Sequence, residues 1–364
     1  MINFFDLTKQ QKILSSHLDK NIGKVLKHHN HIQGQEVRLL ENKLANYISS
    51  KYCVTTASGT DSLLLALMSL DIKKDDEIIT SPFSFVSAVE VINLLGAKPI
   101  FVDIDPLTYN IDSDKIENKI TNKTKAIMPI SMFGQMSNLT QINKIATKYK
   151  IPVIEDAAQS FGARFKNNYS CNFTTIGCTS FFPTKPLGCY GDGGACFTNN
   201  LKISKKIRSL SLHGKDKNKF YYKYAGINSR LDTIQAAILL AKLKVFNKEI
   251  KLRNKVANHY NNLLKELTQD VQLPFIKNNY HSVYAQYTIQ TNKRNELKKY
   301  LYKNNIPSII YYPLSLNKIK YINSKDSCPN SERVVKRVLS LPFHPYMKKQ
   351  TQEFIVSKIY KFFK

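Results

Sequence analysis

The stretch "DEIITSPFSFVSAVEVINLLGAKPIFVDI", residues 76–104, decides the fold class. It opens with the short apolar run 76–80, continues through residues 84–96, where apolar side chains recur every three or four positions, and closes with the apolar run 98–104. Short β-branched runs are typical of strands buried on both faces, and the intervening spacing is typical of a helix that stops at Gly96. The stretch therefore predicts a strand–helix–strand unit with parallel strands.

The same alternation extends in both directions from this unit. Further strands are predicted at 125–130, 151–157 and 178–182, and further helices at 59–70 and 138–150. Strands that alternate with helices indicate an α/β fold, here a doubly wound domain around a mostly parallel sheet.

The pattern changes after the apolar helix predicted at 230–250. Lysine-rich helical stretches then surround the apolar segments 284–291 and 306–314. We interpret residues 1–250 as an N-terminal arm plus a large domain, and residues 251–364 as a smaller α+β domain. The length of 364 residues, 43% of them hydrophobic, is sufficient for two such cores.

Neither a membrane span nor a secretion signal is expected. The chain has no apolar run of about 18 residues, and its beginning, "MINFFDLTKQQKIL", lacks a basic start, an apolar run and a cleavage site. A cytoplasmic protein is the prediction. The six cysteines do not form the close pairs of a zinc site, so free thiols and no metal are expected; they are Cys53, Cys171, Cys178, Cys189, Cys196 and Cys328.

The formal net charge of +27 is large. It is compatible with nucleic acid or with a polyanionic small substrate as partner. The lysines are scattered along the whole chain, and no zinc-finger or RNA-binding aromatic motif accompanies them. A general excess of lysine accounts for the pattern, so we expect no nucleic-acid partner and favour a small anionic substrate.

The motif "ASGTDSL", residues 57–63, places a small loop at the start of a predicted helix. Free amide hydrogens and a partial positive charge at a helix N-terminus suit a phosphate group near Gly59 and Thr60. The alternative is that Thr60 only caps the helix.

The motif "VIEDAAQSFGA", residues 153–163, places Asp156 at the carboxyl end of a predicted buried strand. Ligands of open α/β sheets bind at that edge, and a buried carboxylate requires a partner or a proton. The alternative is an aspartate that caps a helix.

The stretch "SFFPTKPLGCYGDGGACFT", residues 180–198, places Lys185 between Pro183 and Pro186 and before four glycines. The prolines fix backbone angles, and the glycines allow turns and close approach. A lysine near a buried site loses its proton more readily and can then attack a carbonyl. The alternative is an exposed lysine in a surface turn. A phosphate-binding P-loop is excluded, because its lysine follows the glycines.

The motif "AGINSRLDTIQAAIL", residues 225–239, places Asn228 and Arg230 before a strongly apolar helix. Arginine suits bidentate capture of a carboxylate or phosphate; the alternative is a salt bridge at the helix start. Taken together, a phosphate loop, a buried acid, a reactive lysine and an anion clamp are what pyridoxal 5′-phosphate requires.

These motifs resemble the sugar aminotransferases of the DegT/DnrJ/EryC1/StrS family, within the fold-type I pyridoxal-phosphate enzymes, and the likeness extends from "FFDLTKQQ" to "SLPFHPY". Within that family the sequence motifs are most similar to those of bacterial enzymes that aminate UDP-2-acetamido-2-deoxy-3-oxo-glucuronate for O-antigen-type lipopolysaccharides.

The resemblance implies a role for each site residue. Lys185 would bind the cofactor aldehyde covalently, Asp156 would pair with the ring nitrogen, Gln159 would approach the ring hydroxyl, and Phe85 would stack on the ring, where plain core packing is the alternative. Gly59, Thr60 and Ser180 would hold the phosphate. Asn228 and Arg230 would come from the second subunit of a homodimer, Asn228 to the phosphate and Arg230 to the acidic groups of the sugar.

The resemblance also implies transamination, with L-glutamate as donor and 2-oxoglutarate as product, because Lys185 is present where a dehydratase subset of the family has histidine. One departure concerns the sugar: the most similar relatives have His-Tyr-Pro where this chain has Tyr311-Tyr312-Pro313. An aminotransferase for another 3-keto or 4-keto deoxysugar nucleotide, and a non-catalytic sensor with this fold, are the alternatives.

Overall fold

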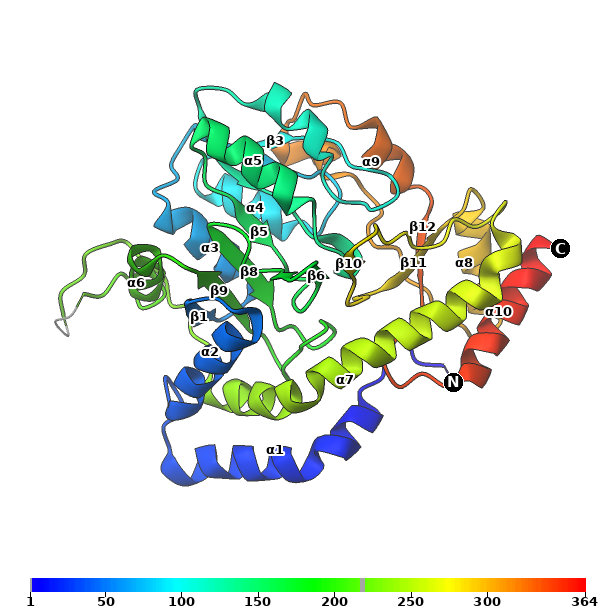
Figure 1. Cartoon of the computed structure of the whole chain (residues 1–364), viewed down its shortest axis with the longest axis horizontal. Coiled ribbons are helices and arrows are strands. Elements are labelled where there is room, and N and C mark those ends of the chain that lie inside the picture. The colour runs from blue at the N-terminus through cyan, green and yellow to red at the C-terminus, as the bar shows by residue number, and fades with distance from the viewer. Residues whose placement is uncertain (1, 217–219) are drawn as a thin grey trace.

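In the computed structural model, which describes residues 2–216 and 220–364, helices pack on both sides of a central sheet (Figure 1). The α-helices are α1 Thr8–His28, α2 Gln35–Ile48, α3 Gly59–Ser69, α4 Ser87–Leu94, α5 Leu139–Tyr149, α6 Leu201–Leu210, α7 Thr233–Leu264, α8 Arg294–Lys303, α9 Pro329–Val334 and α10 Lys349–Phe363. The strands are β1 Tyr52–Thr56, β2 Glu77–Thr80, β3 Lys98–Phe101, β4 Thr124–Met128, β5 Ile154–Asp156, β6 Arg164–Phe165, β7 Asn168–Tyr169, β8 Ile176–Ser180, β9 Gly194–Thr198, β10 Tyr280–His281, β11 Tyr287–Gln290 and β12 Val338–Leu341.

The central sheet is mostly parallel, as predicted. Strands β3, β2 and β4 pair in that order in parallel, and β5 pairs in parallel with β8. Parallel bridges from Ile127 to Val153 and from Ile130 to Asp156 join the two groups. The exception is β9, which lies antiparallel between β8 and β1. Strands β1 and β9 were not predicted, although each has five residues; β9 begins inside the glycine-rich stretch.

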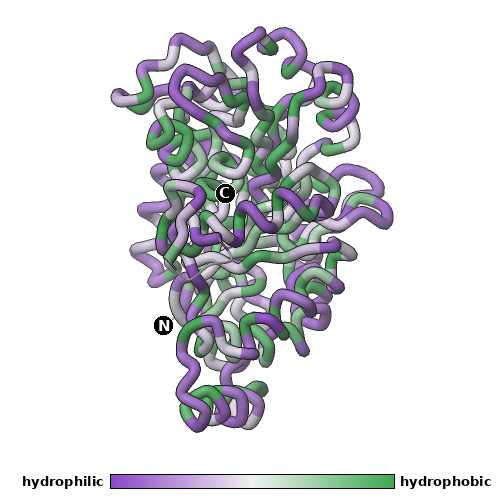
Figure 2. Tube along the Cα trace, turned by 90° about the vertical axis from the view of Figure 1, so that its left-hand side faces the viewer, coloured by the Kyte–Doolittle hydropathy of each residue, from purple (hydrophilic) through white to green (hydrophobic). Residues whose placement is uncertain are grey.

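Both faces of the sheet are covered, and adjacent residues of one strand enter different cores. Cys196 of β9 packs in a core with residues of α3 and α4. Its neighbours Ala195 and Phe197 pack in a second core with residues of α2 and α7. This alternation explains why the strands are continuously apolar in sequence. In the hydropathy-coloured trace, hydrophilic segments lie mostly along the outline (Figure 2).

Helix α7 is 32 residues long and continues without a break through residue 250. Leu239 and Phe246 belong to the core beside the sheet, whereas Ala257 and Tyr260 belong to a core shared with α8, β11, β12 and α10. Figure 1 shows α8 and α10 around one end of α7. The proposed division at residue 250 therefore falls inside a helix and stays a prediction. Of the two apolar segments predicted beyond it, residues 284–291 contain β11, whereas residues 306–314 form only a bridge at Ile309.

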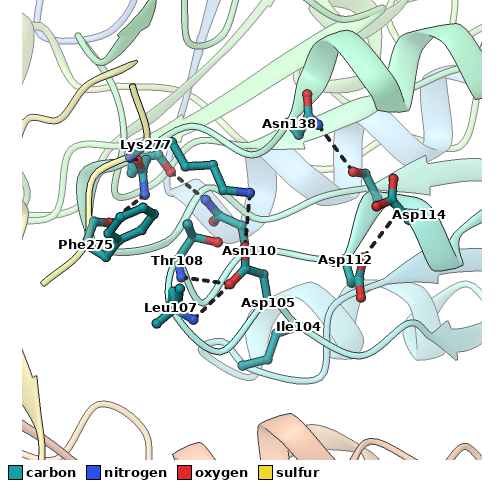
Figure 3. A network of polar contacts seen from close by, with 12 residues as sticks. Ile104, Asp105, Leu107, Thr108, Asn110, Asp112, Asp114, Asn138, Phe275 and Lys277 are labelled. Atoms are coloured by element: carbon teal, nitrogen blue, oxygen red, sulfur yellow. Dashed lines mark hydrogen bonds and ion pairs between the residues drawn. The ribbon is translucent and has the colours of Figure 1, made fainter. Parts of the chain in front are cut away.

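A polar network joins the loop after β3 to the segment before β10 (Figure 3). The Asp105 carboxylate accepts hydrogen bonds from the amides of Leu107 and Thr108 and forms an ion pair with Lys277 at 3.0 Å. These partners satisfy the Asp105 carboxylate, so we assign Asp105 a structural role. Within residues 2–216 and 220–364, no three His, Cys, Asp or Glu side chains are arranged to hold a metal.

The six cysteines are free, as predicted, and all of them are buried. The helices of the described ranges include none that is both long enough and apolar enough to cross a bilayer.

Candidate active site

The candidate site lies where two adjacent parallel strands end. Strand β5 ends at Asp156 and β8 ends at Ser180, so both carboxyl ends lie at the same edge of the sheet. The Asp156 amide donates to the Pro129 carbonyl, and the Asp156 carbonyl accepts from the Ser131 amide, both at 2.9 Å. These backbone bonds fix Asp156 at the edge where open α/β sheets bind their ligands.

Two consecutive acids on β5 have different surroundings. Glu155 is fully buried, and its carboxylate accepts hydrogen bonds from the hydroxyls of Ser131 and Ser170 and from the amide of Cys171. In the described chain, the Asp156 carboxylate accepts one hydrogen bond, from the Ala158 amide at 3.0 Å. Burial raises the pKa of Asp156, while that amide and the charge of Lys185 oppose the rise. Asp156 therefore retains capacity for a cationic partner, whereas Glu155 is satisfied by the fold.

Lys185 stands at the tip of a closed loop. Its amide donates to the Phe182 carbonyl at 2.9 Å, and a Cβ placed on Gly188 would lie 2.5 Å from the Pro183 carbonyl oxygen, so only glycine allows this closure. The lysine is half-buried, unlike the exposed lysine of a surface turn. Burial lowers the pKa of its amine, and the charge of Asp156 raises it. A larger share of the amine is then neutral and able to attack a carbonyl.

The start of α3 lies against the end of β8. The Ser58 hydroxyl accepts from the Asp61 amide at 3.0 Å, so Ser58 caps the helix and the alternative role for Thr60 is wrong. A Cβ on Gly59 would lie 2.6 Å from the Cβ of Ser180, which makes this contact possible only for glycine. The first amides of α3 and the Ser180 hydroxyl together form a fitting cradle for a phosphate.

Aromatic and amide groups border the carboxylate. Gln159 is 4% exposed, accepts from the Phe133 amide at 3.0 Å and donates to the Tyr312 hydroxyl at 3.3 Å. The Tyr312 ring lies 6.1 Å from that of Phe85 and 5.6 Å from that of Tyr311. Phe85 is 55% exposed, so the alternative of plain core packing is wrong for it. An exposed phenylalanine near a buried carboxylate offers a face for a flat ligand.

Asn228 and Arg230 flank Ser229, which contacts the loop before α3. The Ser229 hydroxyl between them accepts from the Ala57 amide at 3.1 Å, which ties the segment to the loop before α3. Asn228 is exposed and Arg230 is half-buried. No side-chain hydrogen bond or ion pair joins either to Lys185 or Asp156 among the described residues. Their contribution to a neighbouring subunit's site stays a prediction.

The residues present fit pyridoxal 5′-phosphate. An acid with spare capacity, an amine, an exposed aromatic face and a helix N-terminus beside a hydroxyl all converge on one edge of the sheet. Three polar residues around this site were missed from sequence: Ser229, Gln235 and Lys242. Gln235 and Lys242 stand seven residues apart in an otherwise apolar stretch of α7, but that spacing does not indicate which partner they contact.

Comparison with known proteins identifies the family of the chain. Residues 13–360 match the model of the DegT/DnrJ/EryC1/StrS aminotransferase family. The chain is 48% identical over 95% of its length, and 96% of the relative's, to a UDP-2-acetamido-2-deoxy-3-oxo-D-glucuronate aminotransferase from Pseudomonas aeruginosa.

Two solved structures show the same fold. A DegT/DnrJ/EryC1/StrS aminotransferase from Brucella abortus superposes with a TM-score of 0.95 at 37% identity, covering 100% of this chain and 99% of that one. NtdA from Bacillus subtilis with bound cofactor PMP gives a TM-score of 0.89 at 28% identity, covering 96% of this chain and 82% of that one. The chain therefore belongs to the DegT/DnrJ/EryC1/StrS aminotransferase family, and it is a pyridoxal-phosphate-dependent aminotransferase of fold-type I.

Proposed function

We propose that the protein transfers the amino group of L-glutamate to a keto sugar nucleotide, namely UDP-2-acetamido-2-deoxy-3-oxo-glucuronate. The observation that carries the proposal is the 48% identity to an aminotransferase named for that substrate, extending over 95% of the chain. The interacting charges of Asp156 and Lys185 at one sheet edge support the chemistry. The amino sugar would serve a bacterial surface polysaccharide, and the reaction would take place in the cytoplasm.

Pyridoxal 5′-phosphate supplies an aldehyde that amines attack and a ring that withdraws electrons from the reacting carbon. Lys185 would hold the cofactor between turnovers. Once the donor amine displaces it, Lys185 would take the proton from the donor α-carbon and later return one, as general base and then acid. Burial lowers its pKa, which favours the neutral amine that the first of these steps requires.

Asp156 would keep the ring nitrogen protonated. Its carboxylate has one hydrogen-bond donor within the described residues, and a second, cationic donor would offset the burial that raises its pKa. Gln159 would orient the ring hydroxyl, and Phe85 would cover one ring face. Gly59, Thr60 and Ser180 would hold the phosphate and so fix the reacting carbon relative to Lys185.

The second half of the reaction requires the keto sugar nucleotide. The Tyr312 hydroxyl accepts from Gln159, and the Tyr311 ring adjoins that of Tyr312, so both tyrosines would contact the sugar. Arg230 of a second subunit would bind the acidic groups of the sugar nucleotide, and Asn228 of that subunit would complete the phosphate site. We accordingly propose a homodimer with two shared active sites.

A different keto sugar is the second candidate. Tyr311 favours it, because the resemblance places histidine at this position and Tyr311 adjoins the Tyr312 ring at 5.6 Å. A phenol in place of an imidazole alters both the size and the charge of the group facing the sugar.

The test is a substrate panel with purified, cofactor-loaded protein and L-glutamate. The panel comprises the UDP-linked 3-keto sugar with a C6 carboxylate, the same sugar with a C6 hydroxymethyl group, and a 4-keto-6-deoxy sugar nucleotide. Release of 2-oxoglutarate is followed for each. The proposal predicts the highest kcat/KM for the carboxylate. A preference for either of the other sugars would show that the proposed substrate is wrong. Absence of 2-oxoglutarate release with every keto sugar nucleotide would contradict the proposed function.

A further inference from the structure

Lys242 is the only lysine of the described chain whose side chain is almost wholly buried, at 2% exposure. It lies on α7, and its Nζ donates to the Gly188 carbonyl at 2.6 Å and stands 4.4 Å from the centre of the Tyr190 ring. Burial lowers its pKa to about 8, while Glu249 and Cys189 oppose the fall. Both direct contacts are with the loop that carries Lys185.

A second residue of α7 holds the same loop. Gln235, seven residues before Lys242, accepts from the Tyr190 amide at 2.9 Å and donates to the Tyr190 carbonyl at 3.4 Å. Two turns of helix separate the pair, so they share one face of α7. Glu249, another seven residues on, accepts from Gln10 of α1 and from the Tyr346 hydroxyl. One polar stripe of α7 thus holds the Lys185 loop at one end and two other segments at the other.

The loop is closed on itself, so a displacement of Gly188 would shift Lys185 as well. The Cys189 amide donates to the Phe181 carbonyl at 2.7 Å, and Gly188 packs directly on the carbonyl of Pro183. Residues 181–189 therefore form one compact unit with Lys185 at its tip. A shift of about 1 Å in a reacting group can lower a rate on the order of a hundredfold.

Stability alone does not account for a lysine at this position. Burying an ammonium with a single backbone acceptor carries a large desolvation penalty, and an apolar side chain of similar volume is often neutral or stabilising in such places. The aromatic face of Tyr190 offsets part of that penalty. The contact that an apolar residue would lose is the one to Gly188.

We propose that Lys242 is a positioning residue for the aminotransferase reaction, which sets the place of Lys185 by clamping Gly188 to α7, with Gln235 as a second clamp at Tyr190. This inference rests on the proposed role of Lys185.

The test compares Lys242→Met with Lys251→Met in the cofactor-loaded protein. Lys242→Met keeps the unbranched stem and removes the donor, whereas Lys251 is exposed on the same helix and serves as control. Amide hydrogen exchange is measured for peptides covering 181–190 and 154–158, together with the thermal midpoint, kcat and the KM for L-glutamate.

For Lys242→Met we expect faster exchange over 181–190 only, a thermal midpoint equal to or above that of the wild type, and kcat lower by about tenfold to a hundredfold with little change in KM. Lys251→Met should match the wild type in every measurement. Wild-type exchange and kcat in Lys242→Met would overturn the inference. So would a lowered thermal midpoint with faster exchange throughout the protein, which indicates a role in general stability.

Two further variants keep the outcome decisive. Gln235→Met removes the second clamp and should also speed exchange over 181–190; unchanged exchange there would contradict the inference even if Lys242→Met failed to fold. Lys185→Ala distinguishes failure of the positioning role from failure of the proposed function. If Lys185→Ala is inactive while Lys242→Met behaves like the wild type, positioning alone fails; if Lys185→Ala turns over normally, the proposed function itself fails.

Discussion

Gly59 lies directly against Ser180: a Cβ on Gly59 would stand 2.6 Å from the Ser180 Cβ, closer than two such atoms can come. The contact joins the start of α3 to the end of β8. It also makes the helix amides and the Ser180 hydroxyl neighbours, although more than a hundred residues separate them in sequence. The spacing of the phosphate site therefore depends on the absence of one side chain.

Gly59→Ala should weaken cofactor binding. The added methyl group separates α3 from β8, and overpacking of this kind costs about 1–3 kcal/mol, which corresponds to about fivefold to 140-fold in affinity. The dissociation constant of pyridoxal 5′-phosphate, measured by absorbance titration of the cofactor-free protein, checks this. Gly23→Ala is the matched control, because a Cβ there meets nothing within 4 Å. Gly23 lies inside α1, so that change should leave affinity unaltered and stabilise the protein by about 0.5–1 kcal/mol. Equal affinities for both variants and the wild type would refute the close-contact account.

Asp156→Asn should remove activity without weakening the fold. Loss of the charge that would hold the ring nitrogen protonated should lower kcat on the order of a hundredfold or more. Because the pKa of Asp156 is raised in the folded state, its contribution to stability is present below its unfolded pKa and is lost as the pH rises through the folded pKa.

The cofactor-free asparagine variant should therefore be at least as stable as the wild type at pH 7, and the difference should shrink towards acid pH. Thermal unfolding between pH 4 and pH 8 measures it, with the range set by the usual carboxyl pKa of about 4. A variant that is clearly less stable at pH 7 would show that the carboxylate has a structural role instead.

Arg230→Ala should impair the sugar half-reaction far more than the glutamate half-reaction. Loss of a charged partner for the sugar nucleotide should lower kcat/KM at least about thirtyfold, and glutamate should be nearly unaffected. Single-turnover absorbance measurements separate the two. If the site is shared between subunits, mixing Arg230→Ala with the inactive variant Lys185→Ala should restore activity. After the two variants exchange subunits, one site of the mixed dimer contains both the native Lys185 and the native Arg230. Equal losses in both half-reactions, or no recovery on mixing, would argue against a partner-supplied arginine.

The thiols should be inert in the native protein. All six cysteines are buried, and burial raises the pKa of Cys189 to about 11 and that of Cys328 to about 12. The thiolate forms of these two residues are therefore scarce at neutral pH, and a thiolate is the reactive species. Titration with a chromogenic disulfide at pH 8 should detect almost no thiol before denaturation and all six after it. Rapid native labelling would contradict the buried positions.

The parallel strands were predictable because burial on both faces leaves short, mostly apolar runs, such as residues 78–79 within 76–80 and 99–102 within 98–104. Helix α4 begins at Ser87 rather than at the predicted residue 84, because Pro82 and the serines beside it favour a turn. Asp156 and Lys185 were predictable because strand ends and proline-bounded turns leave signals in the sequence.

The clamp at Lys242 was not predictable in the same way. A chain with 54 lysines and arginines hides one buried lysine among many exposed ones. Its partner is the carbonyl of Gly188. Every residue has a backbone carbonyl, so the residue type at that position does not indicate the contact. Only the three-dimensional path of α7 past the loop reveals the contact.

The most direct test of the central claim is to reduce the cofactor-loaded protein with borohydride and map the modified peptide by mass spectrometry. The account predicts a single pyridoxyl adduct, on Lys185. An adduct on another lysine, such as Lys242, or no adduct at all would contradict it.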